Sequence, residues 1–290
     1  MRSVGNLSGG SGASLVVDIK RETVGRGRLV LRDIRAEFRA GDFVLILGGS
    51  GTGKTTLIKA ILGDSRADGS VLLNGRDLYS DLRSMRPMIA MVPQFLTLRP
   101  NDTVRDTLAD TAAIKLGRVC SRAEQLRRVD EVLESIGITE HADKYIGQLS
   151  GGQQKKVAMA DQLIGQQKVF ICDEPDSGLD AASRIQQMEM LREISRQGKI
   201  VIVISHEPDD AVAVSDGSRR RLFNKVIVLA RSSFDKAGHL AFCGGTEEAL
   251  RYFGVRRLED IMLEINPVAE GGRGRADEFI ERFRKTERSS

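Results

Sequence analysis

The sequence predicts an α/β fold whose sheet is mostly parallel and is interrupted by a helical insert. Three observations lead to this prediction. The apolar run Phe43–Leu47 leads directly into a glycine-rich loop, as a buried strand does at its carboxyl end. Continuously apolar strands and amphipathic helices alternate from Val169 onward, which is typical of a parallel sheet covered by helices. Between these two regions, residues 101–148 carry only helical patterns.

The N-terminal elements are expected in the following order. Residues 5–14 are rich in Gly and Ser and are interpreted as disordered or as a linker. A strand at Leu15–Ile19 and a basic turn at Arg26–Arg28 come next, followed by more strand. After the glycine-rich loop, the helix Leu57–Leu62 ends at Gly63, where glycine suits a helix C-cap. Further strands are expected at Val71–Leu73 and Met88–Val92.

The helical middle contains two clear helices. The first opens at Asp102–Val104 and ends near Gly117. The second begins at Ser121, which forms a capping box with Glu124. Its apolar stripe consists of Leu126, Val129, Val132, Leu133 and Ile136, and it ends at Gly137.

The second half alternates strand and helix again. The expected strands are Val169–Cys172, Ile200–Ile204, Lys225–Leu229 and His239–Phe242. The helix between the first two carries a stripe that is interpreted as core: Ile185, Met188, Leu191 and Ile194. The tail holds a helix-like piece to Ile265, a glycine hinge and an amphipathic end with Phe279, Ile280 and Phe283. This end is short and mixed in charge, so a helix docked on the core is favoured over a membrane-surface helix.

The composition of the chain limits which kinds of partner and compartment are expected. The 290 residues include 44 basic and 40 acidic side chains, a net charge of +4, which is too balanced to favour nucleic acid as the main partner. No run approaches the roughly 18 apolar residues of a membrane span, and the N-terminus lacks a signal-peptide core. A soluble protein is expected, with any membrane role coming through a partner. Cys120, Cys172 and Cys243 have neither zinc nor disulfide spacing, so a reduced, cytoplasmic compartment is expected.

The segment Gly48–Thr56 fits the spacing G-x-x-x-x-G-K-[ST]. In such a loop, glycine lets successive backbone N–H groups point inward at a phosphate. The helix that follows presents its positive dipole end to the same anion. Lys54 is placed to reach the outer phosphates, and the Thr55 hydroxyl is placed to hold Mg²⁺. The predicted ligand is a nucleoside triphosphate with Mg²⁺.

Two further segments complete the expected site. Asp173 and Glu174 follow an apolar strand, at the sheet edge where ligands bind. One acid there can hold Mg²⁺ through water, and the other can orient or deprotonate an attacking water. Ser150 opens a helix beside two glycines; it is a good N-cap, and the same turn is also a second anion site. Two phosphate-binding turns in one chain suggest two chains that share nucleotides.

The order of these motifs resembles the nucleotide-binding subunit of an ATP-binding cassette (ABC) transporter. The motifs are the phosphate loop, Gln94, Leu149–Gln153 (LSGGQ), Asp173 with Glu174, Ser177–Asp180 and His206. The resemblance covers about residues 15–254. It implies a P-loop NTPase core with a mostly parallel sheet, an antiparallel β subdomain and an inserted helical subdomain at about 101–165. Residues 1–14 are then a disordered segment, and residues 255–290 a C-terminal helical extension.

The resemblance also implies a role for each site residue. The nucleotide-binding residues are Gly48, Gly49, Ser50, Gly51, Thr52, Gly53, Lys54, Thr55 and Thr56, with Ser150, Gly151, Gly152 and Gln153 closing over the ATP of an opposing subunit and Asp180 helping to knit the dimer. Mg²⁺ is expected at Thr55, Gln94 and Asp173. The expected catalytic residues are Glu174 as general base or water-orienting acid, Gln94 at the attacking water and His206 at the γ-phosphate.

The partners implied are a second ATP-binding subunit, identical or different, and transmembrane permease subunits on separate chains. The location implied is cytoplasmic, on the inner face of the cell membrane. Residues 248–254, Asn266-Pro267 and Thr103–Leu108 resemble the G-type (white/lipid exporter) branch and its bacterial relatives, which favours export over import. The alternatives are a cytosolic ABC ATPase with an assembly or scaffold function, and a degenerate regulatory cassette.

One departure from the family concerns the nucleobase. Family members place an aromatic residue about 25 to 30 residues before the phosphate-loop lysine, where it stacks on adenine. The stretch Val24–Leu29 contains none. Val24 or Arg26 is a candidate to replace it, the latter through its planar guanidinium group. The sequence therefore does not choose between ATP and GTP.

Overall fold

The computed structural model describes residues 12–289 except Arg26, Arg118, His206, Asp216 and Gly217. Within these residues, ten strands form one sheet in the order β5-β4-β1-β2-β12-β11-β3-β8-β7-β6, and β9 and β10 form a separate hairpin. The strands are β1 Ser14–Val24, β2 Arg28–Arg39, β3 Phe43–Leu47, β4 Asp68–Leu73, β5 Arg76–Asp77, β6 Ile89–Val92, β7 Val169–Asp173, β8 Ile200–Ile204, β9 Val212–Ser215, β10 Ser218–Arg221, β11 Lys225–Arg231 and β12 Gly238–Gly245.

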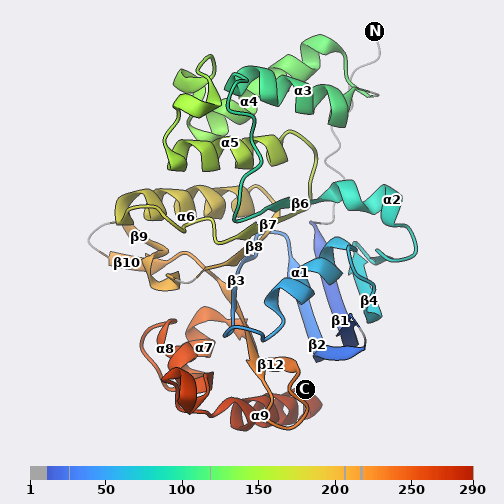
Figure 1. Cartoon of the computed structure of the whole chain (residues 1–290), viewed down its shortest axis with the longest axis vertical. Coiled ribbons are helices and arrows are strands. Elements are labelled where there is room, and N and C mark those ends of the chain that lie inside the picture. The colour runs from blue at the N-terminus through green and yellow to red at the C-terminus, as the bar shows by residue number, and fades with distance from the viewer. Residues whose placement is uncertain (1–11, 26, 118, 206, 216–217, 290) are drawn as a thin grey trace.

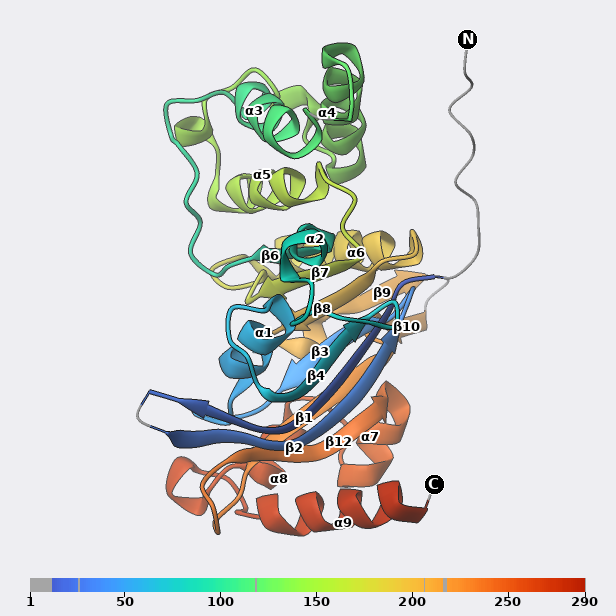
Figure 2. The ribbon, with the colours of Figure 1, turned by 90° about the vertical axis from the view of Figure 1, so that its right-hand side faces the viewer.

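The helices are α1 Lys54–Leu62, α2 Leu82–Met85, α3 Val104–Leu116, α4 Arg122–Ile136, α5 Gly151–Leu163, α6 Ala181–Arg196, α7 Thr246–Phe253, α8 Asp260–Ile265 and α9 Ala276–Ser289. Figures 1 and 2 show three levels. The helices α3, α4 and α5 lie at one end, the sheet with α1 and α6 lies in the middle, and α7, α8 and α9 lie at the other end. None of the helices in the described part of the chain has the length and apolar character needed to cross a bilayer.

The sheet is parallel where the site lies. β3 pairs with β8 and β11, and β7 pairs with β6 and β8, all in parallel. The strands β3 and β8 are buried along their whole length, as the continuous apolar runs predicted. The strands β1, β2 and β4 pair antiparallel at the other side of the sheet. The predicted α/β fold with its mixed sheet and inserted helices is confirmed.

The local elements agree with the sequence in most places. Helix α4 begins at the predicted Ser121–Glu124 capping box and ends at Gly137 in the left-handed conformation. Its apolar stripe differs at one position. Leu126 is exposed, and Gln125 is buried in its place because its amide donates a hydrogen bond to the Cys120 carbonyl, 3.0 Å away.

The expected disordered start lies outside the described residues up to residue 11. Residues 12–14 are described: Ala13 is buried, and Ser14 begins β1 with its backbone N–H donating to Asn74 Oδ1. The strand β1 is therefore longer than expected. At the other end, α9 packs on the sheet through Phe279, Ile280 and Phe283, all buried. The expected docked helix is confirmed.

Candidate nucleotide-binding site

The phosphate loop joins the buried strand β3 to helix α1, and glycine is required where the loop turns. Gly51 and Gly53 have φ of 72° and 93°, the left-handed region that side chains rarely adopt. A Cβ on Gly53 would also lie 2.4 Å from Leu31 Cδ2, so the loop is pressed against β2. Gly53 is the N-cap of α1, which directs the first free N–H groups of the helix toward the loop.

Lys54 points back over the loop. Its Nζ donates hydrogen bonds to the carbonyl oxygens of Gly48, at 2.5 Å, and Gly49, at 3.1 Å. Burial lowers the pKa of Lys54, and the charges of Glu174 and Asp173 oppose that change. The loop therefore holds one ammonium group beside two acids, at the start of a helix.

The two acids follow β7, and Gln94 follows the neighbouring strand β6. Because the two strands are parallel, their carboxyl ends meet at one edge of the sheet. Gln94 Nε2 donates to Glu174 Oε2 at 2.5 Å. Glu174 has φ of 47°, and its backbone N–H donates to the Ile204 carbonyl at 2.9 Å. A left-handed conformation at a residue other than glycine costs roughly 1–3 kcal/mol, so the fold holds this carboxylate in place against strain.

These groups line one cavity of about 440 Å³, which lies within the range of roughly 300–1,000 Å³ typical of small-molecule sites. The residues that line it are Arg28, Val30, Gly49, Ser50, Gly51, Gly53, Lys54, Thr55, Thr56, Gln94, Asp173, Glu174 and Ile204. The structure thus brings most of the expected nucleotide residues together with the two acids and Gln94. Gly48 and Thr52 lie behind the lining, and the Thr52 hydroxyl donates to the Gly49 carbonyl at 2.9 Å.

The remaining expected residues lie elsewhere. Ser150 is the N-cap of α5 and forms a capping box with Gln153. None of the residues 150–153 lines the cavity. Asp180 caps α6, and hydrogen bonds from Ser183 lower its pKa. His206 is outside the described residues.

The residues available for Mg²⁺ offer oxygen atoms, which this hard cation prefers. Thr55, Gln94 and Asp173, which carry a hydroxyl, an amide oxygen and a carboxylate, all line the cavity. The described residues hold no group of three or more His, Cys, Asp and Glu side chains suited to share a metal ion. A cation that keeps several waters and uses few protein ligands, as Mg²⁺ does with nucleotides, fits this set.

Two contributions to the site were missed in the sequence. Arg28 and Val30 line the cavity, whereas the proposed Val24 is an exposed residue outside the lining and Arg26 is not among the described residues. Arg28 lies in the stretch Val24–Leu29, where family members carry an aromatic residue. Its planar side chain is the feature of the sequence that could have identified it as a lining residue. The second is Asn266, whose Oδ1 would lie 2.7 Å from a Cβ on Gly49, so the tail packs on the phosphate loop.

The comparison with family models decides the family. The model described as "ABC transporter" matches residues 31–177, just over half of the chain. The chain belongs to the ABC transporter family. Membership of this family indicates an ATP-binding module with ATPase activity.

Relatives of this cassette carry several names. "ABC transporter G family member 21" of Arabidopsis thaliana is 31% identical over 83% of this chain and 34% of its own length. "Methionine import ATP-binding protein MetN" of Photorhabdus laumondii is 37% identical over 65% of this chain and 58% of its own length. The chain thus spans about a third of the first of these and over half of the second.

A solved structure supports the same fold. CbiO1 of Clostridium perfringens, described as part of the ABC transporter complex CbiONQ, superposes with a TM-score of 0.71 at 25% identity. The match covers 83% of this chain and 92% of that one. Both the core and the inserted helices therefore belong to the ABC ATPase architecture.

Proposed function

We propose that this cassette binds ATP with Mg²⁺, hydrolyses it as one of two facing subunits, and thereby drives export through a separate transmembrane partner. The observation that carries the proposal is the meeting of Lys54, Glu174 and Gln94 in one cavity. A half-buried ammonium group, a helix N-terminus and loop amides suit a triphosphate. The carboxylate of Glu174, whose backbone is held in the left-handed conformation, suits a group that orients or deprotonates water.

Each residue then has a chemical task. Lys54 and the loop bind the phosphates, and Glu174 accepts the proton of the attacking water or orients that water. Gln94 holds the Glu174 carboxylate through their hydrogen bond. Mg²⁺, held by Thr55, Gln94 and Asp173, would neutralise phosphate charge when bound. His206 is proposed to contact the γ-phosphate.

The site is proposed to need a second chain. Ser150, which is exposed, and its neighbours lie at the N-terminus of α5, outside the cavity of their own chain, and the Ser150 hydroxyl accepts from the Gln153 N–H. Residues 150–153 and Asp180 would therefore close over the ATP of a partner copy, identical or different. Such closure is a ligand-driven population shift, because ATP binds the paired state more tightly than the open state.

A groove beside Gln94 is the proposed seat of the membrane partner. It has a volume of about 410 Å³ and lies between the segment after β6 and the helices α3 and α5. Met91, Leu96, Leu98 and Ile114 line it, and Phe95, which is 80% exposed, lies beside it in the sequence. Charged residues also line it: Arg99, Asp102, Asp110 and Asp161. A groove with apolar and charged residues beside a proposed catalytic side chain suits a segment that senses the nucleotide. The partner would be a permease subunit, which places the cassette in the cytoplasm on the inner face of the cell membrane.

Two likenesses bear on the direction of transport. The likeness to G family members and the tail residues favour export, whereas the likeness to MetN, named for import, shows that the cassette alone does not fix direction. The alternative remains a cytosolic ATPase that acts in assembly or scaffolding. Co-purification of an integral membrane protein with the full chain distinguishes the two.

The experiment that tests the proposal uses two inactive variants. Lys54→Ala removes the ammonium group at the phosphates, and Ser150→Arg blocks the surface offered to the partner. Each alone is expected to lose at least about 100-fold in ATPase rate, because each removes transition-state contacts. Mixed together, they restore about one working site in each mixed dimer. A mixture no more active than its components at any concentration refutes the shared site.

A further inference from the structure

A second hollow adjoins the phosphate cavity. It has a volume of about 200 Å³ and shares Arg28, Val30 and Gly51 with the larger cavity. Its other side is the β11–β12 hairpin, which contributes Arg231, Asp235 and Lys236. Because the two spaces share three lining residues, they adjoin, and there is room for a ligand whose phosphates lie on the loop to extend into this hollow.

The hairpin is fixed to the phosphate loop. A Cβ on Gly238 would lie 1.9 Å from the Thr52 carbonyl oxygen, so the hairpin and the loop are in direct backbone contact. Arg231 Nη1 would lie 4.0 Å from a Cβ on Gly51. Arg231 is itself anchored, because its Nε donates to the Lys236 carbonyl at 3.1 Å. A planar guanidinium group therefore stands next to the loop on the hollow side.

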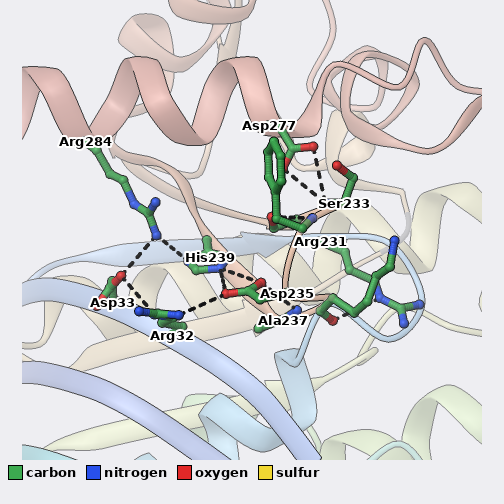
Figure 3. A network of polar contacts seen from close by, with 12 residues as sticks. Arg32, Asp33, Arg231, Ser233, Asp235, Ala237, His239, Asp277 and Arg284 are labelled. Atoms are coloured by element: carbon green, nitrogen blue, oxygen red, sulfur yellow. Dashed lines mark hydrogen bonds and ion pairs between the residues drawn. The ribbon is translucent and has the colours of Figure 1, made fainter.

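Polar contacts with α9 and β2 fix the β11–β12 hairpin in place, as Figure 3 shows. His239 is 3% exposed, and its Nε2 lies 3.1 Å from both carboxylate oxygens of Asp235. Arg284 of α9 donates to His239 Nδ1 at 2.8 Å and to Asp33 Oδ2 at 3.0 Å. Arginine has no acceptor, so Nδ1 accepts and the ring proton on Nε2 points to Asp235.

The same contacts decide which groups remain for a ligand. Asp235 also accepts from the Ala237 N–H at 3.1 Å and lies 3.5 Å from Arg32. Its carboxylate is thus engaged within the hairpin and is poorly placed to read the edge of a base. The other charged groups that line the hollow are cations: Arg28, Arg231 and Lys236.

We propose that the nucleobase of the bound triphosphate lies in this hollow and is stacked by the guanidinium groups of Arg28 and Arg231, in place of the missing aromatic residue. A guanidinium group is planar and stacks on a π-face, whereas a lysine ammonium offers charge without a plane. Stacking is tolerant of base identity because every base has a π-face. The site therefore accepts adenine and guanine nucleotides alike. The inference rests on the nucleotide function proposed above and adds a second segment, the β11–β12 hairpin, to the site.

The test compares ligands with and without a base. The affinities of MgATP, MgGTP and inorganic tripolyphosphate are measured by titration calorimetry for the wild-type chain and for Arg28→Lys and Arg231→Lys. Both substitutions keep the positive charge and remove the planar guanidinium group. MgATP affinity is expected to fall about 3- to 10-fold in each variant, with tripolyphosphate affinity unchanged. Arg76→Lys on the edge strand β5 is the matched control and leaves both affinities unchanged. MgGTP is expected to bind the wild-type chain within about fivefold of MgATP.

Each contrary outcome has its own meaning. Unchanged MgATP affinity in both lysine variants, or equal losses for MgATP and tripolyphosphate, overturns the stacking site and leaves the proposed function standing. A preference above about 30-fold for one purine also overturns it, because only hydrogen bonds to the base edge discriminate so strongly. A wild-type chain that binds neither nucleotide refutes the proposed function and the base site with it.

Discussion

Replacing Glu174 by glutamine separates ATP binding from ATP hydrolysis in this cassette. The introduced amide has nearly the shape of the carboxylate, and its oxygen can still accept the hydrogen bond that Gln94 donates at 2.5 Å. The backbone hydrogen bond to Ile204 is untouched by the change. The substitution therefore removes charge and basicity while keeping the side chain in position.

The size of the effect follows from these contacts. A positioned general base contributes about 10²–10⁴-fold, so the barrier to hydrolysis is expected to rise by about 3–5 kcal/mol. Binding moves the other way, because loss of a negative charge beside the phosphates relieves about 1 kcal/mol of repulsion. Part of this gain in ATP affinity is offset at Lys54. The Glu174 charge raises the pKa of Lys54 and so favours its charged form, and the substitution removes that effect.

The assay pairs ATP turnover with equilibrium ATP binding and with the fraction of dimer in ATP. The variant is expected to bind ATP as tightly as the wild-type chain or more tightly, to lose turnover and to accumulate as a dimer. Glu134→Gln, on the exposed face of α4, is the matched control and keeps all three properties. Hydrolysis by Glu174→Gln within tenfold of the wild-type rate would show that another group activates the water.

Two further predictions concern stability. Phe279→Ala is expected to lower the free energy of unfolding by about 3–5 kcal/mol in a denaturant titration. The reason is that the buried ring lies 4.5 Å from that of Phe253 and 5.7 Å from that of Tyr252. A loss below about 1 kcal/mol would mean that α9 is only loosely attached. Burial lowers the pKa of Lys199 to about 8 from 10.5, so the unfolded chain binds more protons between these values and stability due to this group rises with pH across that window. The stability difference between the wild-type chain and Lys199→Met, measured from pH 7 to 10.5, should change in that sense, and a flat difference contradicts the assignment.

The sequence was most informative where function depends on local spacing. The phosphate loop is a contiguous segment, and its glycines are required by backbone geometry at Gly51 and Gly53. The contact between Gln94 and Glu174 could also be predicted, because both residues follow strands and the carboxyl ends of parallel strands share an edge. The capping box at Ser121 and the N-cap at Ser150 appeared as expected for the same reason, since each is contained within four residues.

The sequence was least informative where segments far apart in the chain meet. Nothing in the pattern around Gly238 indicates that its missing side chain makes room for the Thr52 carbonyl. The candidates from the sequence were Val24 and Arg26, and Arg28 was missed. Which of these residues reaches the cavity depends on the β1–β2 hairpin, whose register shifts between Glu22 and Thr23. A shift of this kind changes which residue reaches a neighbouring site, and residue propensities do not reveal it.

The contact between Asn266 and Gly49 bears on how cassettes of this kind can be recombined. A chimera that exchanges only the stretch from the first strand to β12 would join a phosphate loop from one parent to a tail shaped for another. Mismatched residues at this contact would disturb the turn around Gly49. They would also disturb the hydrogen bond by which Arg284 of α9 holds His239. Exchange junctions in this family should therefore be placed beyond α9, so that the loop and the tail are inherited as one unit.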